Sequence, residues 1–242
     1  GILGTSLVTV MYPRLADLAA QRNWKAFGDS LIDSLNMIHF LLAPIAVGAI
    51  VLREPLVRIV YERGAFDSVA TQETARALLF LSLGMAVFSM RALVSRSFFA
   101  LQDTATPMIV GLVTVGVNVA LNLLLVRPLE QGGLALATSV ASLCGLVLSV
   151  WIMQRNARLL PIHKLVTSAS RVLTASVTMG LVVRLSYPHI AKTIAGVGVV
   201  AELGRVVIAA AEGAILYVLC LRVLNAPEPK VVMGTLKRIL NR

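Results

Sequence analysis

Charged residues are scarce in this chain of 242 residues: Asp, Glu, Lys and Arg make up 14% of it, while 57% of the residues are apolar. Folded soluble domains are about a quarter charged and about half apolar, so the composition excludes an ordinary soluble enzyme. Cysteine is rarer still. Cys144 and Cys220 are the two in the chain, and both fall within apolar runs, which argues against a disulfide framework or a cysteine-based metal site.

Catalytic motifs are also missing. The three histidines, His39, His163 and His189, lie on different segments, and the chain contains no HExxH, GxSxG or CxxC sequence. It has no Walker A glycine loop, so we do not expect it to hydrolyse ATP, and no nucleic-acid-binding motif, so we expect no nucleic acid as a partner. These absences favour a transporter or a scaffold over an enzyme.

Long apolar runs dominate what is present. A membrane crossing takes about 20 residues, and six complete segments of that length occur, at 31–52, 70–92, 107–126, 132–153, 165–186 and 203–224. The runs are too long for strands and show no alternation of apolar and polar residues. We therefore predict an all-α, polytopic transmembrane helical bundle with about six complete spans and a partial span at the N-terminus.

The segments between the spans carry further signals. The chain begins inside an apolar run without Met, and we expect it to be a C-terminal fragment of a longer membrane protein. Residues 13–25 and 53–67 have the pattern of interfacial helices, the first of them separated by Pro13 from the partial span. Thr106 before Pro107 predicts a helix that starts at the proline with the threonine as its cap.

The basic residues are distributed unequally between the two sides of the predicted bundle. The net charge is +10. Connectors on one side carry thirteen Lys and Arg residues, whereas those on the other side carry six, namely Arg53, Arg58, Arg63, Arg127, Arg184 and Lys192. Because cytoplasmic loops are enriched in Lys and Arg, we expect the C-terminus and the loop after Pro13 to be cytoplasmic, in a multi-pass protein.

Ionisable residues within the predicted spans are costly to insert, by about 2.5–3.5 kcal/mol each, and we treat them as candidate site residues. Glu212 lies near the middle of the last span, with Arg171 of the preceding span as its expected partner. Glu202 and Arg205 are three residues apart and should pair along one helix face, and Arg184 could meet Glu202. These groups either hold a helical hairpin together or line a polar groove for a substrate.

A second polar group lies on the spans 107–126 and 132–153. Asn118 and Asn122 are four residues apart and so share one helix face, and Thr138 and Ser142 have the same spacing on the next span. Two carboxamides opposite two hydroxyls can form interhelical hydrogen bonds, or their oxygens can bind a hard cation. Both interpretations stay open at the level of sequence.

Two loop motifs are more specific than composition. They are Leu56-Val57-Arg58-Ile59-Val60-Tyr61-Glu62-Arg63-Gly64-Ala65-Phe66-Asp67 and Arg96-Ser97-Phe98-Phe99-Ala100-Leu101-Gln102-Asp103-Thr104-Ala105-Thr106-Pro107. With the opening segment from Gly1 to Pro13, they resemble the MviN/MurJ family of lipid II flippases, within the multidrug/oligosaccharidyl-lipid/polysaccharide exporter superfamily. The resemblance is carried by motifs from Gly1 to about Arg158 and by hydropathy alone beyond that.

The resemblance implies a bacterial cytoplasmic-membrane protein of fourteen helices, in which 1–158 belongs to the C-terminal lobe and 159–242 holds the final helix pair and a cytoplasmic tail. It implies a non-enzymatic flippase, monomeric and surrounded by membrane lipids, that moves undecaprenyl-pyrophosphate-linked peptidoglycan precursor (lipid II) by alternating access. The final pair would form a groove for the lipid tail, and Arg171, Glu202, Arg205 and Glu212 would lie along it.

Two further implications concern individual residues. Arg96, at the cytoplasmic end of the span 70–92, would act as a gate or draw in the pyrophosphate. Asn118, Asn122 and Thr138 lie on helices that hold a sodium ion in some family members, and sodium is the one cofactor expected. The alternatives are an exporter of another polyprenyl-linked glycan, a membrane-embedded polyprenyl-phosphate transferase, and a packing subunit without a transport role.

Overall fold

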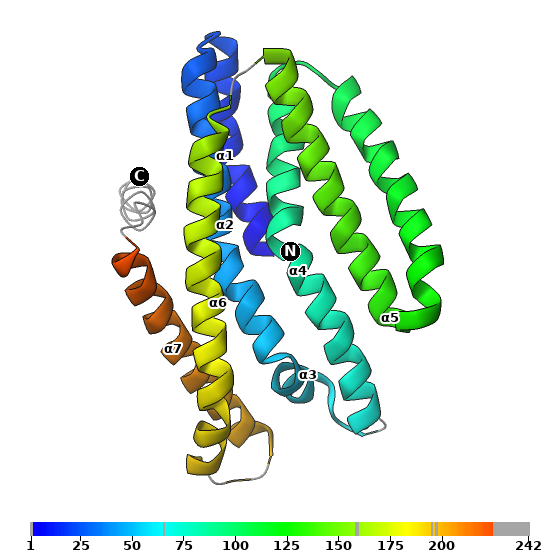
Figure 1. The fold of residues 1–242 in the computed structure, drawn as a ribbon, viewed down its shortest axis with the longest axis vertical. Coiled ribbons are helices and arrows are strands. Elements are labelled where there is room, and N and C mark those ends of the chain that lie inside the picture. The colour runs from blue at the N-terminus through cyan, green and yellow to red at the C-terminus, as the bar shows by residue number, and fades with distance from the viewer. Residues whose placement is uncertain (1, 65, 158–159, 195, 197, 225–242) are drawn as a thin grey trace. The chain divides into compact units, whose positions relative to one another are not determined.

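The computed structural model describes residues 2–64, 66–157, 160–194, 196 and 198–224, and every regular element in these ranges is an α-helix (Figure 1). The helices, in chain order, are α1 (Ile2–Ala20), α2 (Trp24–Val51), α3 (Arg53–Tyr61), α4 (Ser68–Ala100), α5 (Ala105–Ala157), α6 (Ile162–Thr193) and α7 (Val199–Val223). The predicted all-α class is therefore confirmed. The C-terminal tail that we expect in the cytoplasm, 225–242, lies outside the described residues.

Five of these helices, α2, α4, α5, α6 and α7, are long and apolar enough to cross a membrane. At 1.5 Å per residue the 53 residues of α5 would extend for about 80 Å, far more than the roughly 30 Å of a bilayer core. The helix reverses instead at Glu130, whose backbone leaves the helical region with φ 50° and ψ −128°. Its two arms, 105–129 and 131–157, form a hairpin (Figure 1) and correspond to two of the six predicted spans.

The reversal in α5 has a local cause. Pro128 lacks the N–H that would continue the helix, and Gly133 lies so close to the carbonyl oxygen of Leu125 that no Cβ would fit there.

The start of α5 corrects one expectation. The helix begins at Ala105, before Pro107, and the backbone N–H of Thr106 donates to the Asp103 carboxylate at 2.9 Å. Asp103, not Thr106, therefore caps the helix.

The predicted break at Pro13 is wrong. The partial span and the first interfacial segment form one continuous helix, α1, with Pro13 inside it. Val8, Leu15 and Ala19 follow each other at helical spacing and are all buried. Burying this stripe gives about 25 cal/mol for each Å² of apolar surface, which offsets the hydrogen bond that a proline removes from a helix.

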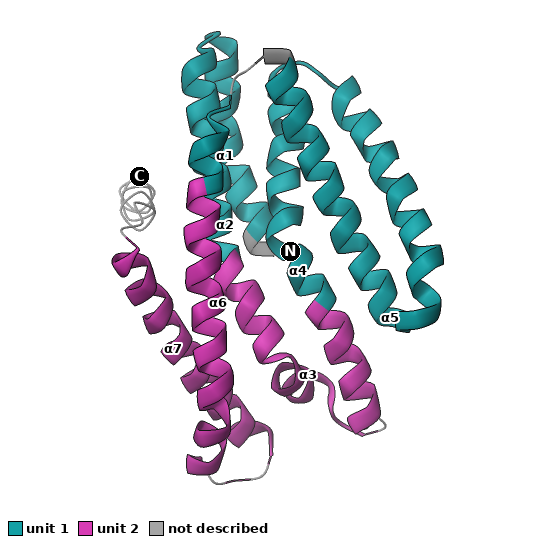
Figure 2. Cartoon of the chain, viewed as in Figure 1, with its two compact units in different colours: residues 1–42, 80–166 teal, residues 43–79, 167–242 magenta. Residues whose placement is uncertain are grey.

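The chain forms two compact units (Figure 2). Unit 1 comprises residues 1–42 and 80–166. Its core is built from α1, the first part of α2, the end of α4 and the second arm of α5, with Phe27, Leu35, Leu93, Phe98 and Met153 among its buried side chains. The predicted boundary at Arg158 concerns the lobes of a longer protein and stays a prediction.

Unit 2 comprises residues 43–79 and 167–242, and its long helices are α6 and α7. Their buried residues recur at helical spacing, as in the series Glu202, Val206, Ala209, Gly213, Tyr217 and Leu221 on α7. Gly213 packs against Met179 and Val183 of α6. The outward faces are apolar instead of polar, with Leu185 72% exposed and Val223 81% exposed, as expected of helices that face lipid.

Candidate functional site

A polar cluster in unit 2 is centred on Glu202, in the first turn of α7. The residue is only 7% exposed, and its carboxylate accepts three hydrogen bonds. Arg205 donates at 2.8 Å, Tyr187 of α6 at 3.2 Å and Arg58 of α3 at 3.4 Å. Two of these donors are cationic, so the buried negative charge is compensated, as a buried carboxylate requires.

Arg205 connects this centre to the segment between α6 and α7. Besides Glu202, its guanidinium donates to the carbonyl oxygen of Ile194 at 2.9 Å and to that of Gly196 at 2.9 Å. Gly196 has a φ of 153° and Gly198 a φ of 116°, values that only glycine adopts readily. The fork of donors on Arg205 therefore holds the backbone of Ile194 and Gly196 beside the start of α7.

Arg58 extends the cluster along α3. Its Nε donates to Glu62 at 3.3 Å, one helical turn further on, and the same Glu62 oxygen accepts the hydroxyl of Thr71 at 2.8 Å. The Arg58 side chain is 49% exposed, whereas that of Arg205 is 18% exposed. The Arg205 pair is thus largely buried and the Arg58 pairs are largely solvated, so the first is energetically the more important.

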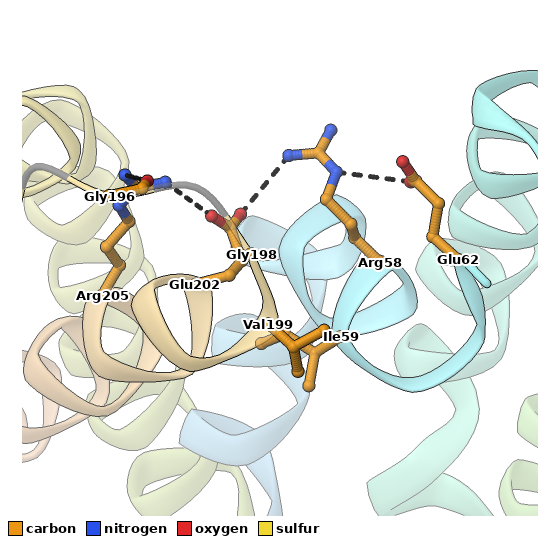
Figure 3. Close-up of a pocket in the computed structure, with 8 residues that line it drawn as sticks. All are labelled: Arg58, Ile59, Glu62, Gly196, Gly198, Val199, Glu202 and Arg205. Carbon is orange, nitrogen blue, oxygen red and sulfur yellow. Dashed lines mark hydrogen bonds and ion pairs between the residues drawn. The ribbon is translucent and has the colours of Figure 1, made fainter.

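A cavity of about 400 Å³ lies beside this cluster (Figure 3). Its polar wall consists of Arg58, Glu62, Glu202 and Arg205, and Ile59 and Val199 lie side by side as its apolar part. The two cations and two carboxylates make the lining neutral overall. Such a surface can bind a ligand through hydrogen bonds and paired charges.

The sequence predicted part of this cluster. The pair of Glu202 and Arg205 is confirmed, because residues three apart meet on any helix. Arg184, by contrast, is exposed and is not among the three described donors to Glu202. Arg58 and Tyr187 were missed as partners. Arg58 is part of the first loop motif, but a separation of 144 residues from Glu202 gives no local signal.

The expected pair of Arg171 and Glu212 is wrong. Glu212 instead accepts a hydrogen bond of 2.7 Å from the hydroxyl of Ser186. Arg171 lies 15 residues before Ser186 on the same helix, or about 22 Å along its axis, which is beyond the reach of an arginine side chain. The partly buried carboxylate of Glu212 is therefore held within the α6–α7 pair by a neutral donor.

Asn118, Asn122 and Thr138 come together in unit 1. Asn118 and Asn122 lie on the first arm of the α5 hairpin, and Thr138 lies on the second arm. Asn122 donates to the amide oxygen of Asn118 at 3.1 Å, and Asn118 donates to the Thr138 hydroxyl at 3.4 Å. The predicted interhelical hydrogen bond is thus confirmed. The Oδ1 atom of Asn122 is buried without a described hydrogen-bond partner. Neutral oxygens of this kind suit a hard cation.

Arg96 lies near the end of α4 in unit 1. It donates to the hydroxyl of Thr9 on α1 at 3.4 Å, so it is a partly buried residue that joins two helices. No group of three or more His, Cys, Asp or Glu side chains within the described ranges could hold a metal ion.

Comparisons with known proteins agree with this architecture. The family model described as lipid II flippase MurJ matches residues 1–204. A probable lipid II flippase MurJ of Rhizobium tropici is 30% identical over 188 residues, which is 77% of this chain and 35% of that protein. The lipid II flippase MurJ of Thermosipho africanus is 31% identical over 147 residues, covering 61% of this chain and 30% of the relative.

A solved structure gives the same result. Lipid II flippase MurJ in an inward closed conformation superimposes with a TM-score of 0.68 at 26% identity, over 91% of this chain and 44% of the other. The chain thus spans about a third of the length of these curated relatives and less than half of the solved structure.

Proposed function

The chain belongs to the MurJ family of lipid II flippases, and from that premise we propose that it supplies helices of a transporter for lipid II. The cargo is a peptidoglycan precursor linked to undecaprenyl pyrophosphate, and alternating access carries it outward across the bacterial cytoplasmic membrane. The observation that carries this proposal is the family match over residues 1–204, which also favours lipid II over another polyprenyl-linked glycan and over a transferase.

The task of such a protein is physical and needs no covalent step. It must accommodate a long apolar tail and a charged headgroup at the same time. The outward faces of α6 and α7 are apolar over a membrane-length surface, with Leu181, Leu185, Val207 and Ile215 all exposed, and they suit a polyprenyl tail. Basic residues such as Arg96 suit the pyrophosphate, since guanidinium groups bind phosphate oxygens with two parallel hydrogen bonds.

The orientation follows from the distribution of basic residues. We place the connectors that carry thirteen Lys and Arg residues, and with them the C-terminus, in the cytoplasm. The α3 helix and the turn between α6 and α7 then lie on the outer side. The proposed state is a monomer surrounded by membrane lipids. Labelling of single cysteines placed on either side of the membrane tests the orientation.

Complementation of a strain depleted of its own flippase tests the function. The full-length gene product should restore growth and lipid II translocation, and failure to do so at normal expression would refute the proposal. Arg96→Ala should impair growth with expression unchanged, whereas Arg76→Ala, at an exposed position of the same helix, should not. Full growth of Arg96→Ala would reduce Arg96 to a positively charged anchor at the membrane surface.

A sodium site at Asn118, Asn122 and Thr138 is the second part of the proposal. The buried and unpartnered Oδ1 of Asn122 favours it, because a buried polar atom without a partner costs about 1–3 kcal/mol. A bound sodium ion would supply positive charge to these neutral oxygens. Sodium should then raise the midpoint of thermal unfolding more than potassium does, and Asn122→Ala should remove the difference. Equal destabilisation of Asn122→Ala in both salts would refute the site.

A further inference from the structure

We propose that the cavity beside Glu202 binds the headgroup of a zwitterionic aminophospholipid of the outer leaflet, namely phosphatidylethanolamine. The inference rests on the orientation proposed above and goes beyond the transport function. The cavity, about 400 Å³ in volume, falls in the range of about 300–1,000 Å³ that is usual for small-molecule sites. It lies wholly within unit 2, between α3, the turn before α7 and the start of α7.

Arg58 has capacity left for a phosphate. Its two hydrogen bonds use Nε and Nη1, and the side chain is 49% exposed. Figure 3 shows its remaining nitrogen directed away from both Glu62 and Glu202. Arg205, in contrast, is occupied by Glu202 and by two carbonyl oxygens. Arg58 is therefore the group that would receive the phosphate, and Arg205 would keep the wall in place.

Glu62 has the complementary capacity for an ammonium group. The bonds from Arg58 and Thr71 both end on its Oε2 atom, and its side chain is 29% exposed. A primary ammonium carries three N–H donors and can bind the Oε1 atom. Glu62 follows directly after α3 and lies one helical turn beyond Arg58, so a positive and a negative group are presented side by side.

The surroundings place this pair at a membrane surface. Ile59 and Val199 supply apolar contact beside the charged wall (Figure 3), and Val200, the next residue of α7, is 85% exposed. The α3 helix and the turn before α7 connect membrane-spanning helices, so they lie at the level of lipid headgroups. A lipid in this position would contact the cavity with its headgroup and the apolar residues with its upper chains.

Charge selects among the common phospholipids. The lining holds two guanidinium groups and two carboxylates, so it offers no net attraction for an anionic lipid such as phosphatidylglycerol. Phosphatidylcholine has a phosphate and a positive charge, but its quaternary nitrogen has no N–H to donate to Glu62. Phosphatidylethanolamine satisfies both sides. One charge-assisted hydrogen bond at a partly exposed site corresponds to a preference of about fivefold.

The experiment uses the full-length gene product in detergent and three lipids with identical dioleoyl chains, with binding followed by native mass spectrometry and thermal unfolding. We expect phosphatidylethanolamine to bind about fivefold more tightly than phosphatidylcholine. Glu62→Gln should abolish that preference while phosphatidylcholine binding stays unchanged. Arg58→Gln should weaken the binding of all three lipids, because each contains the phosphate.

Matched controls lie on or beside the same helix. Glu54 is 52% exposed and pairs with Arg53, and Arg63 donates to a backbone carbonyl. Neither lines the cavity, so Glu54→Gln and Arg63→Gln should keep the full preference. Equal binding of phosphatidylethanolamine and phosphatidylcholine, tighter binding of phosphatidylglycerol, or an equal loss in the controls would each overturn the proposal. If Arg58→Gln does not fold, Glu62→Gln decides alone. Lipid binding in detergent does not depend on lipid II transport, so the two proposals fail separately.

Discussion

Replacement of Glu202 by alanine is the most direct test of the polar cluster in unit 2. The substitution removes a carboxylate that is 7% exposed and accepts hydrogen bonds from Arg58, Tyr187 and Arg205. It leaves Arg205 with only its two carbonyl partners, although its side chain is 18% exposed. An incompletely paired cation near the protein interior is a main cause of large destabilisation.

The magnitude follows from the three bonds. A hydrogen bond between charged groups contributes about 1.5–3 kcal/mol, and one between a neutral hydroxyl and its acceptor about 1 kcal/mol. The pair with Arg58 is largely solvated and contributes less than about 1 kcal/mol. Since Arg58 regains water and Arg205 keeps its carbonyl partners, we expect Glu202→Ala to lower the free energy of unfolding by about 2–4 kcal/mol.

Glu202→Gln should cost less, about 1–2 kcal/mol, because the amide keeps the shape and one acceptor oxygen. A double-mutant cycle separates the partners: the coupling of Glu202 to Arg205 should exceed its coupling to Arg58. Glu73, an exposed residue of α4, provides the control, and Glu73→Ala should change stability by less than about 0.5 kcal/mol.

The assay is chemical unfolding of the purified full-length gene product in detergent, at neutral pH and constant salt. Two results would refute the reasoning. One is an effect of Glu202→Ala no larger than that of Glu73→Ala, which would mean that the cluster adds nothing to stability. The other is a larger coupling to Arg58 than to Arg205, which would contradict the assignment of the energetic weight to the less exposed pair.

Three further predictions concern other positions. Gly180→Ala should destabilise the protein by about 1–3 kcal/mol, because a new Cβ would overlap a neighbouring valine, whereas Gly204→Ala, with open space around it, should be neutral or slightly stabilising. Glu212→Leu should destabilise more than Glu212→Gln, because only glutamine can still accept the hydroxyl of Ser186. Asp103→Ala should cost about 1 kcal/mol at neutral pH through loss of the α5 cap.

Thermal unfolding ranks the two glycine variants, and equal midpoints would contradict the close approach at Gly180. A cysteine at position 212 should resist water-soluble maleimides if Glu212 is enclosed by the helix pair, and rapid labelling would show a wet groove instead.

The effect of Asp103→Ala on stability also depends on pH. The hydrogen bonds from Thr106 hold the pKa of Asp103 below its usual value of 3.8. The stabilisation is therefore complete above that ordinary pKa and is lost as the pH falls through the lower, folded value. The difference between wild type and Asp103→Ala should shrink on acidification, and a constant difference would refute the cap.

Much of this fold could be predicted from the sequence, because its causes are local or belong to the membrane. In lipid every backbone polar group must be paired within its own segment, so long apolar runs become helices and the six predicted spans are present. The reversal between the spans 107–126 and 132–153 coincides with Pro128, which lacks the N–H that would continue the helix, and with Gly133, where a Cβ would not fit. The pair of Glu202 and Arg205 needed only the geometry of one helix.

Other features depended on tertiary packing. Pro13 alone suggests a helix break, yet the helix continues through it because Val8 and Leu15 are buried on one continuous face. Glu212 contacts Ser186 and not Arg171, because the packing of α6 against α7 places Ser186, and not Arg171, beside it. Arg58 reaches Glu202 across 144 residues of sequence. Apolar runs specify which segments enter the membrane, but the register between helices comes from side-chain packing over the whole unit, and it is this register that selects the partners of each charge.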